Sequence, residues 1–276
     1  MAALTWPAGR TAGPIPPRRW WSMSARAFQC WVTVYKHTLR SSIWTSVFGP
    51  LFYLWAIGFG LGALVDRHGT AALGGVSYAE FLAPALLAIS AMTTALNEST
   101  YPVFGALKWS KIYIAAQYSP LRPPDIFRGH LMFIAMRLAI NAAIFTVFIC
   151  VFGVARSGWI ALAAPVVVLT GLVFAAPAAA WAMVVRSDNS FAYLLRFGIT
   201  PLMLFSGTFF PISRLPGWLR LIAYAMPLWH GVALCRSLSL GRAEILGALG
   251  HVVYLIAVLA VGLWAGSVTY RRRLYT

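Results

Sequence analysis

The stretch ITPLMLFSGTFFPISRLPGWLRLIAYAMPLWHGVALCRSLSLG, residues 199–241, decides the fold. It begins as an apolar run of the kind that enters a bilayer. Pro211, Pro216, Gly217 and Pro227 then follow within seventeen residues, so one helix cannot pass through it. Non-helical backbone at membrane depth persists only where it is buried in protein or lines a cavity. The pattern predicts a segment that enters the membrane and turns back at the mouth of a substrate pathway.

An outer surface loop with two short amphipathic helices lying on the membrane fits the same residues. Aromatic side chains are common at membrane interfaces, so they agree with both interpretations. In the first interpretation, the side chains that line or gate the outer mouth are Phe209, Phe210, Trp218, Trp229, His230 and Arg236.

Composition places the whole chain in a membrane. Of the 276 residues, 60% are hydrophobic and 10% are charged, and the mean hydropathy is +0.75. The three cysteines have no metal-ligand spacing. Six spans near the ~20 residues that a bilayer requires are expected. They lie at about 43–65, 78–101, 131–153, 159–185, 193–210 and 247–269.

The distribution of basic residues predicts which ends of these spans face the cytoplasm. Fifteen Lys and Arg fall on the side of the N-terminus, the 102–130 loop and the C-terminus, and six fall on the other side, with Arg137 inside a span. The positive-inside rule therefore puts both termini in the cytoplasm of a multi-pass protein of the cytoplasmic membrane. Four of the six exceptions lie in 211–246, so a cytoplasmic placement of that segment stays open. This rule also accounts for most of the +16 net charge without nucleic acid as a partner.

The N-terminal region divides into two parts. Residues 1–22 are rich in Pro and small residues and predict a disordered cytoplasmic tail. Residues 23–41 have a helical period, with the apolar stripe Phe28, Val32, Tyr35, Leu39 opposite the polar stripe Arg26, Gln29, Thr33, Lys36, Arg40. This pattern indicates an amphipathic helix on the inner membrane surface and its lipids. A soluble helix packed on another subunit is the alternative.

The transmembrane domain, 42–270, contains one sizeable inner loop, at 102–130. A short basic and aromatic helix is expected there, formed by Lys108, Trp109, Lys111, Tyr113, Gln117 and Tyr118 and closed by prolines. Such a helix suits docking into a groove on a soluble partner, and a second interfacial helix fits equally. The chain ends in a basic cytoplasmic tail, 271–276.

Two charged residues fall inside the expected spans. Glu98 lies near the inner end of the second span, and Arg137 lies ~12 Å into the third at 1.5 Å per residue. Charges at such positions pair with each other or face a cavity. We therefore expect a Glu98–Arg137 pair, although snorkelling of each side chain to the headgroups is an alternative.

The sequence contains none of the common motifs of enzyme active sites. There is no phosphate loop for ATP, and the six acidic residues and five histidines are dispersed, without HExxH or GxSxG. No catalytic, metal-binding or cofactor-binding residue is expected. A transferase acting on a lipid-linked substrate stays open through Asp66 and His68, and so does a scaffold that anchors a soluble complex through the inner loop.

Several motifs carry a resemblance to a known family. The set Glu98, Tyr101, Phe104, Leu121, Asp125, Ile126 and Gly129 resembles the second span and inner loop of ABC-2 type exporter permeases, in the NodJ-like branch. The family's carboxy-terminal signature is similar to Ile199, Thr200, Pro201, Ser206, Gly207, Phe210, Pro211, Leu215, Pro216, Pro227, Leu228, His230 and Arg236. The basic ending at 271–274 also matches. Two positions depart from the pattern, since Ile114 and His130 stand where the family has acidic residues.

The resemblance implies an all-α, type V exporter-like permease with six spans. An N-terminal interfacial helix, an inner coupling helix and outer re-entrant helices before the last span complete it. Two copies, or this chain and a homologue, would pair with two separate ABC ATPase subunits that bind ATP and Mg. Members of the family export lipo-oligosaccharides, polysaccharides or hydrophobic drugs, and drug efflux confers antibiotic resistance.

Overall fold

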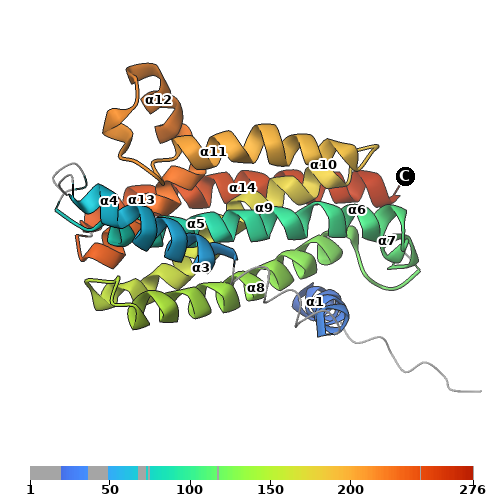
Figure 1. Cartoon of the computed structure of the whole chain (residues 1–276). Coiled ribbons are helices and arrows are strands. Elements are labelled where there is room, and N and C mark those ends of the chain that lie inside the picture. The colour runs from blue at the N-terminus through green and yellow to red at the C-terminus, as the bar shows by residue number, and fades with distance from the viewer. Residues whose placement is uncertain are drawn as a thin grey trace, which may run out of the picture.

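The structure is a computed structural model that describes residues 20–36, 49–67, 73, 75–116, 118–242 and 244–275. In these ranges the regular elements are all helices, and most run side by side in one bundle (Figure 1). One end of the bundle carries α4 (Gly62–Arg67) and α12 (Gly217–Ala225), and we call it the hairpin end. The other end carries α7 (Ile112–Ala116) and the C-terminus, and we call it the loop end.

Among the described residues, four helical stretches are long and apolar enough to cross a membrane. They are Tyr78–Lys108, Pro123–Val151, Gly158–Ala182 and Ile245–Leu274. The elements that form them are α5 (Tyr78–Ser99) with α6 (Tyr101–Lys108), α8 (Pro123–Val151), η4 (Gly158–Leu162) with α9 (Ala163–Ala182), and α14 (Ile245–Tyr275). These agree with a polytopic membrane protein and with four of the six expected spans.

The first and fifth expected spans are helical but irregular. The first is formed by α3 (Gly49–Tyr53), the π-helix η2 (Leu54–Leu61) and α4, and its expected start at 43–48 lies outside the described residues. The fifth is formed by α10 (Asn189–Tyr193), the π-helix η5 (Leu194–Ile199) and α11 (Thr200–Phe205). It ends before the expected residue 210 because Gly207 adopts a left-handed backbone (φ 76°). A total of six spans stays a prediction.

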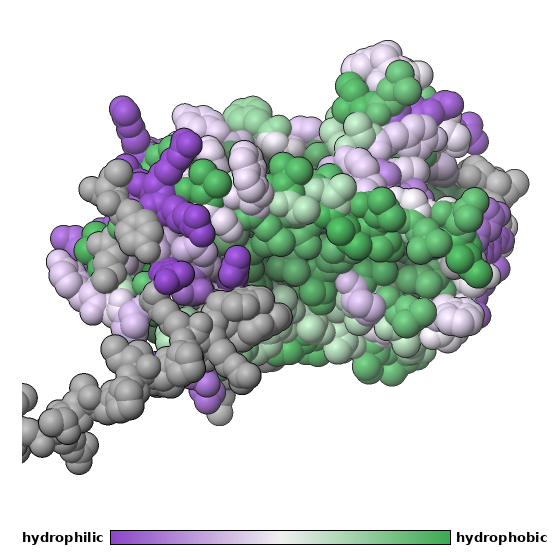
Figure 2. Space-filling view, turned by 180° about the vertical axis from the view of Figure 1, so that it is seen from behind, coloured by the Kyte–Doolittle hydropathy of each residue, from purple (hydrophilic) through white to green (hydrophobic). Residues whose placement is uncertain are grey.

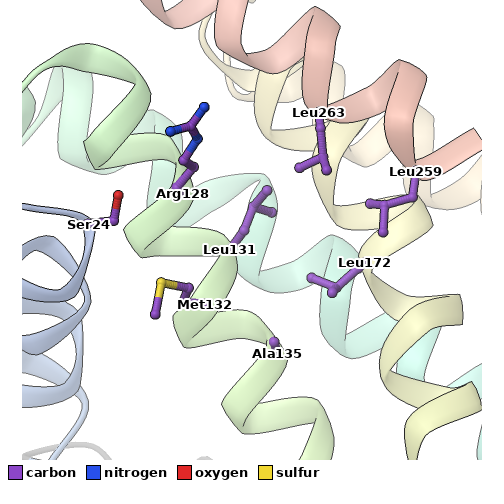
Figure 3. A pocket seen from close by; sticks show the side chains of 8 residues that line it. All are labelled: Ser24, Arg128, Leu131, Met132, Ala135, Leu172, Leu259 and Leu263. Carbon is purple, nitrogen blue, oxygen red and sulfur yellow. The ribbon is translucent and has the colours of Figure 1, made fainter. Parts of the chain in front are cut away.

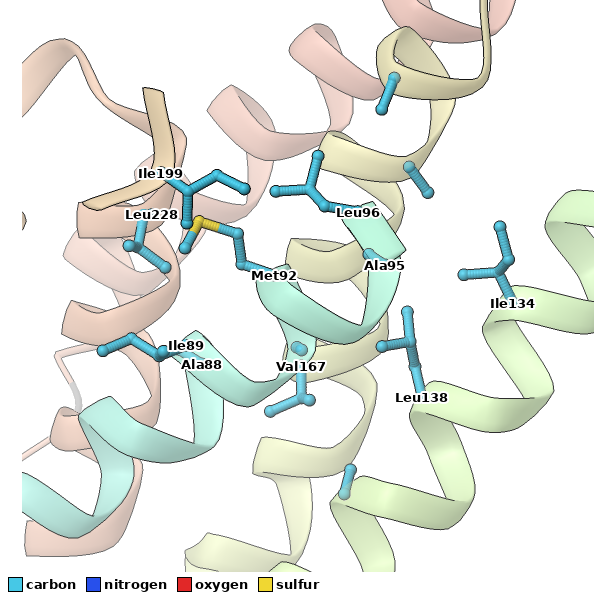
Figure 4. Packing of buried hydrophobic residues seen from close by; sticks show 14 of the residues in the cluster. Ala88, Ile89, Met92, Ala95, Leu96, Ile134, Leu138, Val167, Ile199 and Leu228 are labelled. Carbon is cyan, nitrogen blue, oxygen red and sulfur yellow. The ribbon is translucent and has the colours of Figure 1, made fainter. Parts of the chain in front are cut away.

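Helix α5 is the centre of the bundle. It packs against α8, α9, η2 and α13 (Pro227–Leu240), and nearly all of its side chains are buried. Figure 4 shows Ala88 and Ala95 of α5 among larger side chains from its neighbours, such as Leu138 and Val167. Without a hydrophobic driving force in lipid, small residues of this kind stabilise a bundle by letting helices approach closely.

The surface of the bundle is banded. Figure 2 shows hydrophobic side chains over the middle of the molecule and the most hydrophilic ones gathered toward its ends. The basic residues Arg271, Arg272 and Arg273 are exposed at the loop end. This distribution is the one expected of a protein whose middle lies in hydrocarbon and whose ends lie in water.

Helix α1 (Trp20–Lys36) crosses the bundle instead of joining it. Figure 1 shows it end-on beside α8, near the loop end. Its buried face includes Met23, Ser24 and Ala27, whereas Arg26 and Gln29 are exposed. In the described part of the chain the apolar stripe also turns toward the bundle, because Phe28, Val32 and Tyr35 are partly buried and pack against its core. Leu39 and Arg40, which continue it in the sequence, lie outside the described residues.

We expect Gly129→Ala to lower the melting temperature of the purified chain in detergent. A Cβ at Gly129 would lie 2.5 Å from Ala27 Cβ and 2.8 Å from the carbonyl oxygen of Ser24, so α1 must move away from α8. Overpacking of this kind costs about 1–3 kcal/mol. Gly250→Ala is the matched control, because no atom lies within 4 Å of its added Cβ in α14. Equal melting of the two variants would contradict this close crossing.

Candidate functional site

The chain turns sharply between α6 and α8. Helix α6 ends at Lys108, Lys111 has a left-handed backbone (φ 54°), and α7 begins at Ile112. The expected single helix over Lys108–Tyr118 is therefore wrong, because a left-handed residue interrupts a right-handed helix. The expected 102–130 loop is also shorter, since α8 already begins at Pro123, where proline is well tolerated in a first helical turn.

Exposed basic and apolar side chains gather at this turn, and we call them the loop surface. They are Lys108, Trp109, Lys111, Ile112, Ile114 and Tyr118. Trp109 is 61% exposed and Tyr118 is 92% exposed, which is unusual for such large side chains. Gln117 lies outside the described residues, and Tyr113 does not belong to the loop surface because it is 1% exposed.

Tyr113 instead enters a buried group of rings that we call the aromatic cluster. Its members are Trp31 of α1, Tyr113 of α7, Phe127, His130 and Phe133 of α8, and Tyr270 of α14. His130 stacks on Trp31 with ring centroids 4.1 Å apart, and the ring of Tyr113 lies 5.9 Å from that of Tyr270. The cluster joins the short helix next to the loop surface to three longer helices.

A hydrogen bond fixes the centre of the aromatic cluster. Tyr113 Oη lies 3.1 Å from His130 Nδ1. Burial, and secondarily the nearby Tyr270, raise the pKa of the Tyr113 phenol well above its ordinary value. The phenol therefore keeps its proton at neutral pH and can donate it to His130 Nδ1. The sequence predicts Tyr113 as a docking residue and singles out His130 only as a departure from the family pattern, so it does not predict that the two side chains meet. The 17-residue separation of the two gives no periodic signal.

Two polar contacts connect α5 to α8 inside the bundle. The guanidinium of Arg137 forms an ion pair with Glu98, and it also lies 4.6 Å above the ring of Tyr35 of α1. One turn farther, Asn141 Nδ2 donates to Thr94 Oγ1 at 3.4 Å. The structure thus brings Glu98 and Arg137 together. The sequence carries a signal for the second contact too, because Thr94 and Asn141 stand four residues from the charged pair in the directions that antiparallel helices require.

At the hairpin end, Arg236 holds the turn that follows α11. Its Nη2 donates to the carbonyl of Gly207 at 3.0 Å and its Nε to the carbonyl of Phe81 at 3.2 Å. The guanidinium carbon also lies 3.7 Å from the centre of the Phe81 ring. Arg236 is therefore engaged with the backbone of two segments, which is a structural role for a residue that the sequence analysis assigned to the pathway.

The other residues expected at the outer mouth pack against different parts of the bundle. The ring of Phe209 lies 6.0 Å from that of Tyr53 in α3, and its carbonyl accepts a hydrogen bond from Tyr78 of α5. His230 stacks on Tyr254 of α14, 3.9 Å away.

Trp229 belongs to the same group as His230. Its ring lies 4.8 Å from that of His230 and contacts His251 of α14. Trp229 and Phe210 also pack against one cluster that includes Ile212 of the short 3-10 helix η6 (Ile212–Arg214). Trp218 is 64% exposed on α12, which stands off the bundle (Figure 1). Trp229 thus connects Phe210 and His230, and a gate formed by these side chains stays a prediction.

A cavity of about 190 Å³ lies between α3, α5 and α11. Its lining combines Tyr53, Leu86, Ile89 and Met203 with the hydroxyls of Ser90 and Thr93. Both hydroxyls donate to carbonyls of α5, so their polarity is satisfied without a ligand. The sequence signal for this face is the polar series Ser90, Thr93, Asn97 at helical spacing, which the sequence analysis did not use.

The described residues also show where possible metal ligands and the acidic residue of the transferase alternative lie. No group of three or more His, Cys, Asp or Glu residues that could hold a metal occurs among them. Asp66, the residue on which a transferase would depend, accepts a hydrogen bond from the amide of Tyr78 at 3.0 Å. Its carboxylate therefore caps α5, while His68 lies outside the described residues.

Comparison with known proteins agrees with this architecture. Three relatives named Nodulation protein J align over nearly their full lengths. The protein of Rhizobium leguminosarum bv. trifolii is 32% identical over 96% of this chain and 97% of its own. That of R. leguminosarum bv. viciae is 30% identical over 99% of both chains, and that of Rhizobium meliloti is 29% identical over 98% of this chain and 99% of its own. Residues 19–240 match the family described as ABC-2 type transporter. These matches confirm the resemblance seen in the sequence motifs, and the protein belongs to the ABC-2 type transporter family.

Proposed function

We propose that the protein is the permease subunit of an ATP-driven exporter that moves an amphiphilic substrate outward across the cytoplasmic membrane. A glycolipid, a lipo-oligosaccharide and a hydrophobic drug are the substrate classes. Hydrolysis would occur on a separate ABC ATPase subunit, which would bind ATP and Mg, so this chain itself would be no enzyme and hold no cofactor. Membership in the ABC-2 family supports a transporter subunit.

The observation that carries the proposal is the connection of the loop surface to the bundle. Exposed Trp109 and Tyr118 beside two lysines provide an anchor for a soluble partner, since large aromatic residues supply most of the energy of interfaces. Behind them, Tyr113 belongs to the aromatic cluster that contacts α1, α8 and α14. A movement of the partner at the loop surface would therefore reach three helices at once.

The substrate would pass along the face made by α3, α5 and α11. The small cavity on this face has apolar walls and two hydroxyls, which suits an amphiphile. Phe52, Trp55 and Phe197 are 65%, 67% and 75% exposed on the irregular first and fifth helical segments. Two copies of the chain, or this chain and a homologue, would close the pathway by covering such surfaces.

The orientation follows from the basic loop end. Lys108, Lys111 and the three terminal arginines are exposed there, so this end would lie in the cytoplasm together with both termini. The hairpin end, with Phe209, Phe210, Trp218, Trp229, His230 and Arg236, would then face outward. Because Arg236 contacts Gly207 and Phe81, it would hold the outer turn in place beside the pathway.

The test is purification of the full-length chain from its host in mild detergent, with identification of the co-purifying subunits and an ATPase assay. We expect a nucleotide-binding subunit in stoichiometric amount. Trp109→Ala should weaken its association by about 2 kcal/mol, the cost of losing an interface anchor, and charge removal at Lys108 and Lys111 should lower the ATPase rate further. Trp218→Ala is the matched control, because Trp218 is equally exposed at the opposite end (64% against 61%).

The alternative functions give different results in the same experiment. A chain that purifies alone and has no associated ATPase activity contradicts the exporter. A transferase would be active without any ATPase and would depend on Asp66 or His68. A scaffold would bind a partner through the loop surface but tolerate substitution throughout residues 211–246.

A further inference from the structure

We propose that His230 of α13 and His251 of α14 together bind one divalent transition-metal ion of the kind that imidazole prefers, such as Zn²⁺. The two helices contact each other, and both side chains lie toward the hairpin end. The site shares no residue with the cavity between α3, α5 and α11. It is also separate from a cavity of about 260 Å³ between α1, α8, α9 and α14 (Figure 3). The ion needs only the contact of α13 with α14, whether or not His230 also borders the transport pathway.

The two imidazoles face each other through the same ring atom. Nδ1 of His230 lies 2.7 Å from Nδ1 of His251. The other ring nitrogen of His230, Nε2, lies 3.0 Å from the carbonyl oxygen of Tyr224. A carbonyl oxygen only accepts hydrogen bonds, so Nε2 of His230 carries the proton. The Nδ1 atom of the neutral ring therefore directs a lone pair at His251.

His251 can direct a second lone pair at the same point. Its Nδ1 donates to His230 in the structure, and a shift of that proton to Nε2 makes Nδ1 a metal ligand instead. His251 is only partly buried, and no residue that the structure describes forms a hydrogen bond with its Nε2. Water can therefore accept the moved proton. A cation would then replace one proton between the two rings.

The distance between the two ligand atoms is close to that of a zinc site. Zn–N bonds are ~2.0–2.1 Å long, so neighbouring nitrogens around a tetrahedral ion stand ~3.3 Å apart. The two Nδ1 atoms would have to separate by ~0.6 Å, which small side-chain rotations allow because both rings are partly exposed. The hydrogen bond from Nε2 of His230 to a backbone carbonyl is also the outer contact that orients metal-binding histidines. Water would fill the remaining positions on the ion.

A bound ion would strengthen a junction that the structure already holds together. The ring of Tyr254 of α14 stacks on His230, 3.9 Å away, and its hydroxyl donates to the carbonyl of Ala225 at the end of α12. Trp229 covers the pair, with its ring 4.8 Å from that of His230 and 5.0 Å from that of His251. The ion would therefore fix the α12–α13 junction to α14.

The experiment is calorimetric titration of the full-length chain, purified in detergent without a polyhistidine tag, with Zn²⁺ and with Mg²⁺. We expect one Zn²⁺ per chain and a higher melting temperature in its presence, because the ion binds the folded state. Mg²⁺ prefers oxygen ligands and should have neither effect. His230→Gln and His251→Gln should each weaken Zn²⁺ binding more than about tenfold, since even a change to an outer partner of a ligand costs that much. The double variant should lose no more than either single one, because one ion needs both rings.

Tyr254→Phe is the matched control. It removes a hydroxyl next to the site but keeps the ring that stacks on His230, so the affinity for Zn²⁺ should stay the same. Melting without Zn²⁺ shows which variants are folded. Equal Zn²⁺ binding by wild type and a folded His230→Gln or His251→Gln variant would overturn the site. A wild-type chain whose melting temperature does not rise with Zn²⁺ would overturn it without any variant.

Discussion

Glu98→Gln is expected to destabilise the protein strongly, although the side chains of Glu and Gln have nearly the same size. Arg137 is 4% exposed, and its guanidinium forms an ion pair with Glu98 inside the bundle. The variant removes the carboxylate and leaves a buried positive charge without its counter-ion. Breaking a buried pair in this way costs about 3–5 kcal/mol, which we expect to see as a lower melting temperature in detergent and reduced transport.

A second ion pair of the chain provides the matched control. Arg156 donates from Nε and Nη2 to the carboxylate of Glu80, each at 2.7 Å, but its side chain is 45% exposed at the hairpin end. Water solvates Arg156 whether or not the pair forms, so Glu80→Gln, which leaves Arg156 without the carboxylate, should change the melting temperature little. A Gln oxygen can still accept the hydrogen bond from the Ser77 amide. Comparable losses in Glu98→Gln and Glu80→Gln would contradict the importance of burial.

Double variants separate the pair from the individual charges. Glu98→Gln combined with Arg137→Gln leaves no buried charge, so it should melt above Glu98→Gln alone. The swapped variant, Glu98→Arg with Arg137→Glu, should recover part of the activity lost in each single change. A swapped variant no better than either single one would indicate that the two residues act independently.

The Glu98–Arg137 contact is within reach of sequence reasoning, whereas its surroundings are not. Charges in apolar spans are so costly that two of them at similar depth predict a pair. The neighbouring Thr94–Asn141 contact carries no charge, and Tyr35 lies on a helix outside the spans. Helical period and hydropathy identify such helices one by one, but the rotation of one helix against another is decided by the packing of all of them.

The structure of the loop end is also only partly predictable from the sequence. Its composition correctly predicts exposed basic and aromatic residues, because polar and charged runs between spans lie in water. The left-handed backbone of Lys111 cannot be predicted from the residue type, since Lys has no preference for that conformation. The structure also explains why His130 stands where the family has an acidic residue. Its ring stacks on Trp31, which a carboxylate could not do.

At the hairpin end the prolines and glycines predict the break but not the arrangement. The helix ends after Phe205, and the chain turns at Gly207, within the stretch that the sequence identifies as unable to pass as one helix. The signature residues after it then pack in two directions. Phe209 packs toward α3 and α5, and Trp229 and His230 pack toward α14. A list of aromatic residues in one segment therefore does not define a gate.

Tyr113→Ala is expected to uncouple transport from ATP hydrolysis in the assembled transporter. The side chain is buried between α1, α8 and α14, and truncation of a buried aromatic residue costs about 3–5 kcal/mol. Because α7 is a short helix of five residues, this loss should detach α7 from the aromatic cluster and leave the bundle folded. The loop surface would still meet the ATPase, but its movement would no longer reach the three helices.

Tyr113→Phe is the matched variant for this prediction. It keeps the ring contacts with Trp31 and Tyr270 and removes the hydroxyl that lies 3.1 Å from His130 Nδ1, at a cost of about 1–3 kcal/mol for the unpaired nitrogen. Transport per ATP should therefore fall far less than in Tyr113→Ala.

Hydrogen exchange of α7 gives an independent measurement, since its amides should exchange faster in Tyr113→Ala while those of α8 keep their protection. If Tyr113→Ala transports normally although α7 exchanges faster, the movement of the ATPase subunit is transmitted to the bundle through another contact. The continuous α5–α6 stretch behind Lys108 would then be the next connection to test, because it joins the loop surface to the centre of the bundle without passing through the aromatic cluster.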